Sequence, residues 1–427
     1  STALLAVTPV VQAATKVTNR LTIQGTRFYE TKSKQQYYIK GVIYQPNNTN
    51  ELTIPDPLAD ASGCERDIPY LQDLGVNTIR VPITDNDQDH DDCMNQLADA
   101  NINVFLDLLS VNASMPAYDT FMLDDFVKKI DTFRKYPNFV GVFAGNEVVT
   151  SNVTTVSAGY VKAIVRDVKA YIAAREIQLY VGYSSGDDPV TRNNIMQYMN
   201  CGNVKDQVDF YALNLHSWCG DDVNFQNSGF EDATKNTTKL TVPVIMGEFG
   251  CKGERPQSFG EVGPLFGSEL VDTFSGGFAS SYGDNSTDYG LVAITSKGVK
   301  TLDEFDNLKD QYSQASPKSV SMDKADPIAR KSQSCPRITP DWLSALTLPP
   351  MPSPKACQCL VNSFTCALNF GSEDTDMDAL NRTNQRMCPA GKCSEIFADP
   401  ANGVYGTWTM CPYEVKMAFM INQNYTK

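Results

Sequence analysis

Two apolar runs, each ending at or near a glutamate, constrain the fold of this 427-residue chain most strongly. Residues 139–147 read FVGVFAGNE and residues 242–250 read VPVIMGEFG, with Glu147 and Glu248 near their ends. Continuous apolar runs of this length are typical of parallel strands that are covered on both faces. In a closed barrel of such strands, a carboxylate at the carboxyl end faces the active-site mouth. We therefore predict that both glutamates belong to one site.

Strand-like and helix-like segments alternate from about residue 37 to residue 312. Helical patterns lie between the strand-like segments, for example at residues 67–74 and 161–175. This β-then-α alternation predicts the α/β class and, within it, a (β/α)8 TIM barrel. The eight expected strands lie at residues 38–44, 77–81, 102–107, 139–147, 178–183, 209–214, 242–248 and 276–281.

The composition changes after the expected barrel, which we place at residues 15–312. Residues 313–356 are rich in Ser, Lys, Pro and Asp, which predicts an extended linker stiffened by proline. Six cysteines then fall between Cys357 and Cys411. A segment this short cannot rely on a hydrophobic core alone, so residues 357–427 predict a small module held by disulfides.

The cysteines also indicate the compartment. Twelve cysteines beside two histidines favour disulfides over zinc sites, and disulfides form in oxidising surroundings. The first 14 residues read either as the remnant of a signal peptide or as an ordinary terminus. Seven Asn-x-Ser/Thr motifs favour a secreted glycoprotein, and they begin at Asn47, Asn112, Asn152, Asn236, Asn285, Asn381 and Asn424.

Charge and motif content exclude other classes of function. The formal net charge is −14 and Lys and Arg form no runs, which argues against a nucleic-acid partner. No stretch reaches the roughly 18 apolar residues of a membrane span. The sequence has neither a Gly-x-Ser-x-Gly motif with a suitable histidine nor a phosphate-binding glycine-rich loop.

Paired carboxylates are the groups that glycosyl chemistry requires. One carboxylic acid protonates the leaving oxygen, and a second carboxylate attacks the anomeric carbon or activates water. Glu147 and Glu248 would lie on the fourth and seventh strands, facing each other across the barrel mouth. Asn146 would hydrogen-bond a sugar 2-hydroxyl. The competing interpretation is that one glutamate is only a salt-bridged barrel residue.

Other polar and aromatic residues at strand ends are candidates for the same site. Arg80 would pair with Glu248 and keep it anionic, unless it is an ordinary surface arginine. Asp107 would bind a sugar hydroxyl or anchor a loop. Trp218, after the sixth expected strand, would stack on a sugar or pack beneath its loop. Further candidates to line the cleft are Tyr44, Gln45, Tyr183 and His216.

Several ordered motifs together resemble one known family. They are residues 41–45 (GVIYQ), 67–71 (DIPYL), 145–148 (GNEV), 181–185 (VGYSS) and 247–251 (GEFGC). The chain is similar in these motifs to glycoside hydrolase family 72, the fungal cell-surface β-1,3-glucanosyltransferases usually held by a GPI anchor. The resemblance spans roughly residues 20–427. It includes residues 357–359 and 408–412, which look like a family 43 carbohydrate-binding module.

The resemblance implies a retaining transfer reaction. Glu248 would be the nucleophile that attacks β-1,3-glucan internally, and Glu147 would be the acid and then the base that activates a second glucan. Their carboxyl groups would lie about 5–5.5 Å apart. The partners would be β-1,3-glucan as donor and acceptor, with no cofactor and no metal. The protein would be an extracellular monomer that meets the membrane only through a GPI anchor.

The resemblance also implies disulfide pairings, of which Cys201–Cys335 would tie the linker to the barrel. The other implied pairs are Cys64–Cys93, Cys219–Cys251, Cys357–Cys411 and Cys388–Cys393. Cys359 and Cys366 would either pair with cysteines beyond Lys427, in which case the module is truncated, or with each other.

The chain departs from the family pattern at three positions. Pro82, His216 and Ser280 stand where the family places tyrosines that line the sugar cleft. Their loss predicts a weakened donor site, because buried aromatic surface is lost, although Tyr282 would compensate. Two alternatives therefore stay open. One is a β-1,3-glucan hydrolase, and the other is a weakly active or inactive glucan-binding wall protein.

Overall fold

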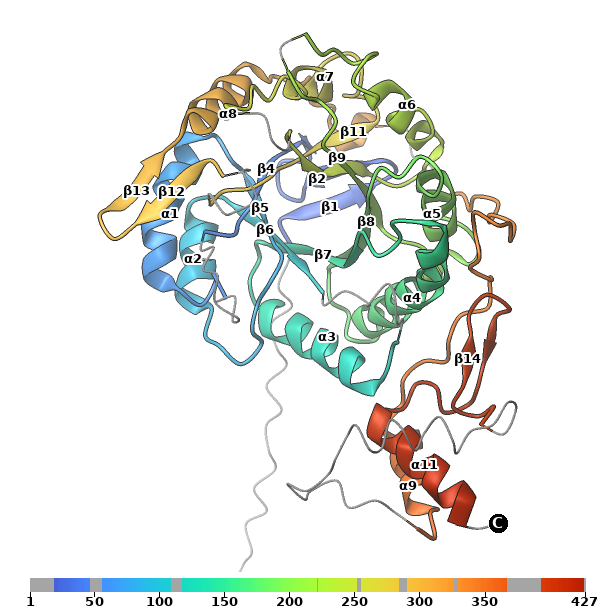
Figure 1. Ribbon diagram of the computed structural model, residues 1–427. Helices are drawn as coiled ribbons and strands as arrows, with labels where there is room; N and C mark the ends of the chain where they lie inside the picture. The colour runs from blue at the N-terminus through green and yellow to red at the C-terminus, as the bar shows by residue number, and fades with distance from the viewer. Residues whose placement is uncertain are drawn as a thin grey trace, which may run out of the picture.

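The computed structural model describes residues 19–46, 56–108, 117–220, 222–251, 255–283, 290–325, 329–366 and 393–425. Its largest part is a closed barrel of eight parallel strands that follow one another in chain order, as predicted (Figure 1). The strands are β4 (Ile39–Ile43), β5 (Thr78–Val81), β6 (Asn103–Asp107), β7 (Phe139–Asn146), β8 (Tyr180–Ser185), β9 (Phe210–Leu215), β10 (Val244–Phe249) and β11 (Phe274–Ala279).

Helices surround the barrel and alternate with its strands (Figure 1). Two of them begin at acidic caps. Asp60 accepts a hydrogen bond from the Gly63 amide, and Asp119 accepts from the Phe121 and Met122 amides, which satisfies free amides of the first turn. The helices are α1 (Ala61–Asp73), α2 (Asp91–Asp99), α3 (Thr120–Phe133), α4 (Ala158–Ala174), α5 (Arg192–Met199), α6 (Phe230–Thr234), α7 (Val262–Phe266) and α8 (Asp303–Gln314).

Phenylalanines fill the inside of the barrel. The rings of Phe105 and Phe143 lie 5.4 and 5.1 Å from that of Phe210, both edge to face. Glycine on a neighbouring strand makes room for these rings: a β-carbon added to Gly182 would lie 2.2 Å from Phe210. The interior is therefore a packed core, and a binding site can form only at the barrel ends.

Smaller strand pairs lie outside the barrel. The antiparallel strands β1 (Leu21–Gln24), β2 (Arg27–Glu30) and β3 (Gln36–Tyr37) form one sheet. Phe28 of β2 packs against Phe105 and Phe210 at centroid distances of 6.4 and 6.0 Å, so this sheet closes off the core. The hairpin of β12 (Val292–Thr295) and β13 (Gly298–Thr301) precedes α8.

The expected linker packs on the barrel. Trp342 is fully buried, with its ring 5.2 Å from that of Tyr198 in α5. The Tyr198 hydroxyl donates to the Ala345 carbonyl at 2.6 Å, and the Leu343 amide donates to Thr155 at 2.9 Å. Beyond it lie α9 (Pro354–Asn362), the short pair β14 (Ala398–Asp399) and β15 (Val404–Tyr405), and α11 (Tyr413–Tyr425).

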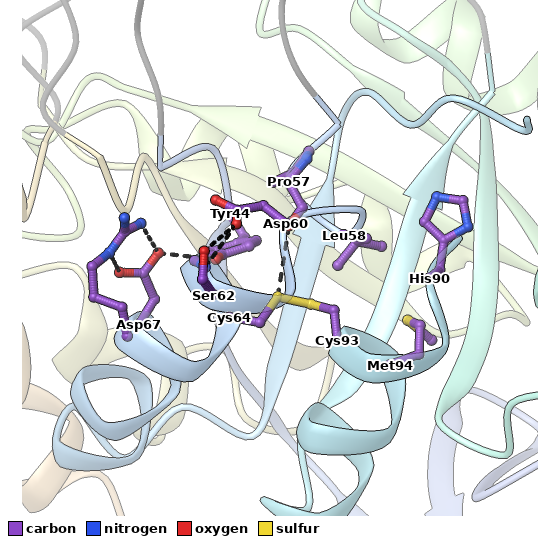
Figure 2. The surroundings of a disulfide bond; sticks show 12 residues. Tyr44, Pro57, Leu58, Asp60, Ser62, Cys64, Asp67, His90, Cys93 and Met94 are labelled. Atoms are coloured by element: carbon purple, nitrogen blue, oxygen red, sulfur yellow. Dashed lines mark hydrogen bonds and ion pairs between the residues drawn. A yellow bond between two sulfur atoms is a disulfide. The ribbon is translucent and has the colours of Figure 1, made fainter. Parts of the chain in front are cut away.

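Four disulfides follow the pairing that the resemblance implies: Cys64–Cys93, Cys201–Cys335, Cys219–Cys251 and Cys357–Cys411. The first joins α1 to α2 close to Tyr44 and Asp67 (Figure 2). Cys393 is also in a disulfide, but Cys388 lies outside the described residues. Cys359 and Cys366 are not paired with each other, so that alternative is wrong.

No helix in the described part of the chain is both long enough and apolar enough to cross a membrane.

Candidate active site

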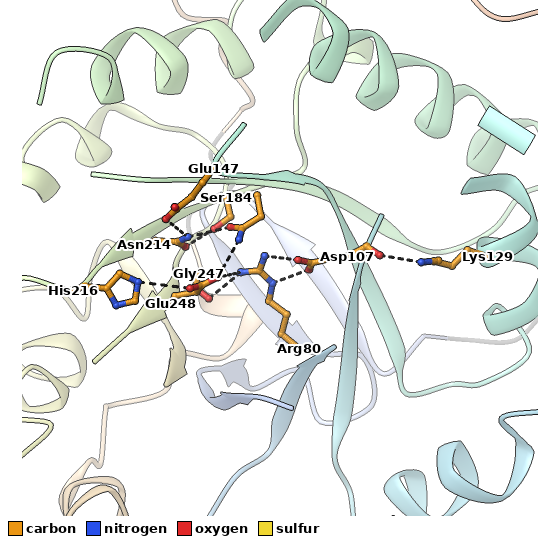
Figure 3. A network of polar contacts seen from close by, with 10 residues as sticks. Arg80, Asp107, Lys129, Glu147, Ser184, Asn214, His216, Gly247 and Glu248 are labelled. Atoms are coloured by element: carbon orange, nitrogen blue, oxygen red, sulfur yellow. Dashed lines mark hydrogen bonds and ion pairs between the residues drawn. The ribbon is translucent and has the colours of Figure 1, made fainter. Parts of the chain in front are cut away.

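The two predicted glutamates lie at the carboxyl ends of the fourth and seventh barrel strands. Glu147 follows β7 directly, and Glu248 is the penultimate residue of β10. Both strands are irregular there. The β10–β9 register shifts between Met246 and Glu248, and the β7–β8 register shifts between Phe143 and Asn146. Such bulges re-aim side chains, which places the carboxylates at one mouth (Figure 3).

The backbone at Glu147 is strained. Its φ is 48°, in the left-handed region that residues with a β-carbon rarely adopt. The Glu147 amide donates to the Ser184 carbonyl at 2.9 Å, which holds this conformation. Strained backbone of this kind concentrates at functional sites.

Two asparagine amides connect the glutamates. The Asn214 side-chain amide donates to Glu147 Oε1 at 2.7 Å and to Asn146 Oδ1 at 3.0 Å. Asn146 in turn donates to Glu248 Oε1 at 3.1 Å. Ser184 donates to Asn214 Oδ1 at 2.6 Å and fixes the orientation of that amide. Asn214 and Ser184 are absent from the sequence-based candidates, although each is a polar residue near the end of a strand.

Arg80 is buried beneath Glu248. The predicted contact is present, with Arg80 Nη1 at 3.6 Å from Glu248 Oε1 and 3.1 Å from the Gly247 carbonyl. Asp107 binds the same guanidinium through both oxygens, at 2.8 and 2.6 Å, and the Phe143 ring lies 4.0 Å from it. The carboxylate of Asp107 thus anchors Arg80, and its predicted contact with a sugar hydroxyl stays a prediction.

His216 lies on the other side of Glu248. Its Nε2 is 3.6 Å from Glu248 Oε2, and its Nδ1 is 2.9 Å from the Gly250 carbonyl oxygen. Trp218 is 8% exposed and packs against Phe230 with ring centroids 5.3 Å apart. Of its two predicted roles, the structure shows the packing beneath the loop.

These neighbours control the charge of Glu248. Burial alone would raise the pKa of its carboxyl, but the contact with His216, the charge of Arg80 and the hydrogen bond from Asn146 outweigh burial, and the pKa is lowered. Glu248 is therefore an anion over a wide pH range, which is the state a nucleophile needs.

Three predicted cleft tyrosines need correction. Tyr44, Tyr183 and Tyr282 are at most 1% exposed, so they present no surface to a sugar in this structure. Tyr44 donates to Asp67 at 3.0 Å, and its ring lies 5.5 Å from that of Tyr282. The ring of Tyr183 packs beside that of Tyr211 at 6.5 Å. All three belong to the hydrophobic core, and the sequence pattern does not distinguish such core tyrosines from residues that line a cleft.

Gln45 stays a prediction. It is half-buried just beyond the end of β4. Pro82 is also half-buried beyond β5, and Ser280 is buried after β11. No cluster of three or more His, Cys, Asp or Glu side chains in the described ranges could hold a metal ion.

The chain is similar in sequence to a known protein family and to several of its members. The family model described as glucanosyltransferase, glycoside hydrolase family 72, matches residues 10–316. Protein EPD1 of Candida maltosa is 36% identical over 99% of this chain and 77% of its own length. The 1,3-beta-glucanosyltransferase GAS5 of Saccharomyces cerevisiae is 40% identical over 79% of this chain and 70% of its own length.

The fold agrees with these relatives. The solved structure of Saccharomyces cerevisiae Gas2p in complex with laminaripentaose matches with a TM-score of 0.88 at 34% identity. The match covers 96% of this chain and 93% of that one. Since a family model covers most of the chain and relatives above 30% identity cover nearly all of it, the chain belongs to the glucanosyltransferase family, glycoside hydrolase family 72.

Proposed function

We propose that this protein is a retaining β-1,3-glucanosyltransferase that cleaves β-1,3-glucan internally and joins the fragment to a second glucan chain. The observation that carries the proposal is the pair Glu147 and Glu248, which two amides connect at one barrel mouth in a member of this family. We also propose that the carboxyl groups of Glu147 and Glu248 lie about 5–5.5 Å apart, the separation expected for a retaining mechanism.

In the first step, the Glu248 carboxylate attacks the anomeric carbon of an internal glucose. Glu147, in its acid form, donates a proton to the glycosidic oxygen, and the reducing-end fragment leaves. A covalent glycosyl ester on Glu248 results. Arg80, fixed by Asp107, holds the attacking carboxylate in place before the bond forms.

In the second step, the Glu147 carboxylate accepts the proton of a hydroxyl at the non-reducing end of an acceptor glucan. That oxygen attacks the anomeric carbon, the ester breaks, and Glu248 leaves as a carboxylate. Two inversions give overall retention and a longer chain. Asn214 steadies Glu147 through both of its roles by one hydrogen bond at 2.7 Å.

The substrate class follows from family membership. Gas2p of Saccharomyces cerevisiae has been solved with laminaripentaose, a β-1,3-glucan oligosaccharide. By analogy, β-1,3-glucan serves as donor and acceptor here. Residues 15–312 form the catalytic domain, residues 313–356 the attached linker, and residues 357–427 a carbohydrate-binding module. We place the protein at the extracellular cell surface, since four disulfides favour an oxidising compartment, and we assign it the GPI anchor usual for the family.

Product analysis tests this function. A reduced laminari-oligosaccharide is incubated with the protein, and the products are separated by chromatography. Products longer than the substrate, lost in Glu147→Gln but kept in a control with the exposed Glu269→Gln, are the expected result. Only shorter products would make the protein a hydrolase. No turnover with glucan binding intact would make it a binding protein.

A further inference from the structure

The ring of His216 lies between two hydrogen-bond acceptors. Its Nδ1 is 2.9 Å from the Gly250 carbonyl oxygen, and its Nε2 is 3.6 Å from Glu248 Oε2. A carbonyl oxygen and an ionised carboxylate can only accept. A neutral imidazole carries one N–H, so one nitrogen would direct a lone pair at an oxygen. The neutral Nδ1–H tautomer suits the Gly250 carbonyl only, whereas the doubly protonated imidazolium also presents an N–H to the Glu248 carboxylate.

The surrounding charges favour the same state. The acids on the elements around His216 are Glu248 in β10, Glu147 after β7, and Glu261 directly before α7. The arginine in contact with Glu248, Arg80 of β5, is also bound through two hydrogen bonds to Asp107. Arg80 is thus one cation shared by two carboxylates, Asp107 and Glu248, and an imidazolium at His216 balances the remaining negative charge.

We propose that His216 is an imidazolium that balances and positions Glu248, so that it links the reaction to pH through the nucleophile. The proposal rests on the proposed role of Glu248. It assigns to this chain a cationic partner at a position where the family pattern predicts an uncharged tyrosine. His216 is a positioning residue, since it acts through Glu248 and transfers no proton to the sugar.

The imidazolium has opposite effects on the two steps. It stabilises the carboxylate before attack, and it stabilises the same carboxylate when Glu248 leaves in the second step. A carboxylate whose negative charge is stabilised is the better leaving group, so His216 favours breakdown of the glycosyl ester. Loss of the proton at high pH therefore slows transfer to the acceptor and lets the ester accumulate.

The direction of titration agrees with this geometry. Burial alone would lower the pKa of His216, but its contact with Glu248 and its hydrogen bond to Gly250 outweigh burial, and the pKa is raised. Because the pKa is raised, His216 is fully charged below the ordinary histidine value, and the ion pair with ionised Glu248 is lost as the pH rises through the raised pKa. Glu261 titrates nearby, since burial raises its pKa to about 7.

Nitrogen-15 NMR of the intact protein tests the protonation state, and the chain has only two histidines, His90 and His216. The variant His216→Gln identifies the His216 signals by their loss. We expect both His216 ring nitrogens to carry protons at pH 7, above the ordinary histidine pKa of about 6.5. A neutral tautomer at pH 7 in the wild-type protein would overturn the proposal without any variant.

The matched variant Glu248→Gln removes the charge but keeps the shape. We expect it to lower the pKa of His216 by about one unit or more, whereas the exposed Glu269→Gln leaves the pKa unchanged. An unchanged pKa in Glu248→Gln would contradict the ion pair. Transfer activity reports the proposed function separately: activity retained by Glu248→Gln would refute the role of the nucleophile even where the NMR result stands.

Kinetics provide the functional readout. In His216→Tyr, a neutral donor replaces the imidazolium, and we expect the alkaline limb of kcat, measured where ester breakdown limits turnover, to lose one ionisation. At pH 6 we expect the glycosyl ester of His216→Tyr to break down at least about tenfold more slowly than that of the wild-type protein. A tenfold change in rate corresponds to the free energy of about one pKa unit. If the alkaline limb of kcat has the same position and steepness in His216→Tyr as in the wild-type protein, the proposed link between His216 and pH is wrong.

Discussion

Single residues distinguish the surroundings of the two glutamates. Glu248 lies between Arg80 and His216 and accepts from Asn146. Glu147 accepts a hydrogen bond from the neutral Asn214. Environments that differ in this way separate acid from nucleophile in glycoside hydrolysis. The neighbours of the two glutamates therefore support the proposed division of roles between them.

The acid limit of activity follows from the lowered pKa of Glu248. Glu248 stays ionised below the ordinary glutamate value of about 4.3, and the stability it contributes is lost only as the pH falls through its lowered pKa. Asn146→Ala removes a hydrogen bond to the charged group, worth about 1.5–3 kcal/mol. We expect the acid limb of kcat/KM to rise by about one to two pH units.

The control for this shift is Asn402→Ala, at an exposed asparagine that bonds Asp399 in the C-terminal part. The pH profile of this variant should match the wild-type profile. An acid limb that stays in place in Asn146→Ala would show that the amide does not stabilise the ionised nucleophile.

Arg80 is expected to contribute to stability as well as to the site. Arg80→Met leaves the buried Asp107 without its partner, which should cost about 3–5 kcal/mol in the free energy of unfolding. Arg134→Met removes a half-exposed pair with Asp131 and should cost less than about 1 kcal/mol. Denaturant unfolding measures both. Equal losses would mean that the Arg80–Asp107 pair is energetically ordinary.

Residues that end apolar runs could be predicted from the sequence, and Glu147, Glu248 and Arg80 are of this kind. Asn214 could not, because an amide at a strand end gains meaning only when side chains from other strands surround it. Tyr183 is predicted to lie at a strand end, but it lies within β8 (Tyr180–Ser185) and its side chain is fully buried. Alternation along one strand does not separate a buried face from a lining face when both faces are covered.

At the scale of strands, close contact of glycine with aromatic rings holds the barrel together. A β-carbon on Gly182 would lie 2.2 Å from Cε2 and 2.3 Å from Cζ of the Phe210 ring. Both distances are so short that the ring or the strand would have to move. We expect Gly182→Ala to lower the free energy of unfolding by about 1–3 kcal/mol, the usual cost of overpacking. Thermal or denaturant unfolding measures this.

Gly263 provides the matched control. It lies in α7, a β-carbon there would meet nothing within 4 Å, and it is exposed. Gly263→Ala should be neutral or stabilising by up to about 1 kcal/mol. If both variants behave alike, the tight packing at Gly182 carries no energetic weight.

The alternation of strands and helices made the barrel predictable, since continuous apolar runs and helical patterns are local signals. The bulges in β7 and β10 are not local. Each depends on pairing with a neighbouring strand, so the sequence predicts that the glutamates share a barrel mouth but not how the strands turn them toward it.

At the scale of the whole molecule, the disulfide between Cys201 and Cys335 joins segments 134 residues apart. Replacing both cysteines by serine removes this cross-link and should cost about 2–5 kcal/mol in stability. The packing of Trp342 against Tyr198 remains, so we expect activity to persist at 25 °C. Limited proteolysis should then cut residues 329–353 sooner.

A proteolysis pattern of the Cys201/Cys335 double variant identical to that of the wild-type protein would contradict the prediction that this disulfide protects the linker. It would mean that packing alone holds the linker to the barrel. Replacing both Cys357 and Cys411 is the comparison, because that disulfide lies within the C-terminal part and should leave residues 329–353 as protected as before.

The most direct test of the central claim is to trap the covalent intermediate. An activated, 2-fluoro-substituted laminaribiosyl donor should form the ester faster than it breaks down, and intact-protein mass spectrometry measures the label. We predict one glycosyl group per chain, located by peptide mapping on Glu248 and absent in Glu248→Gln. A label on another residue, or turnover of glucan by Glu248→Gln, would contradict the assignment of Glu248 as the nucleophile of a retaining enzyme.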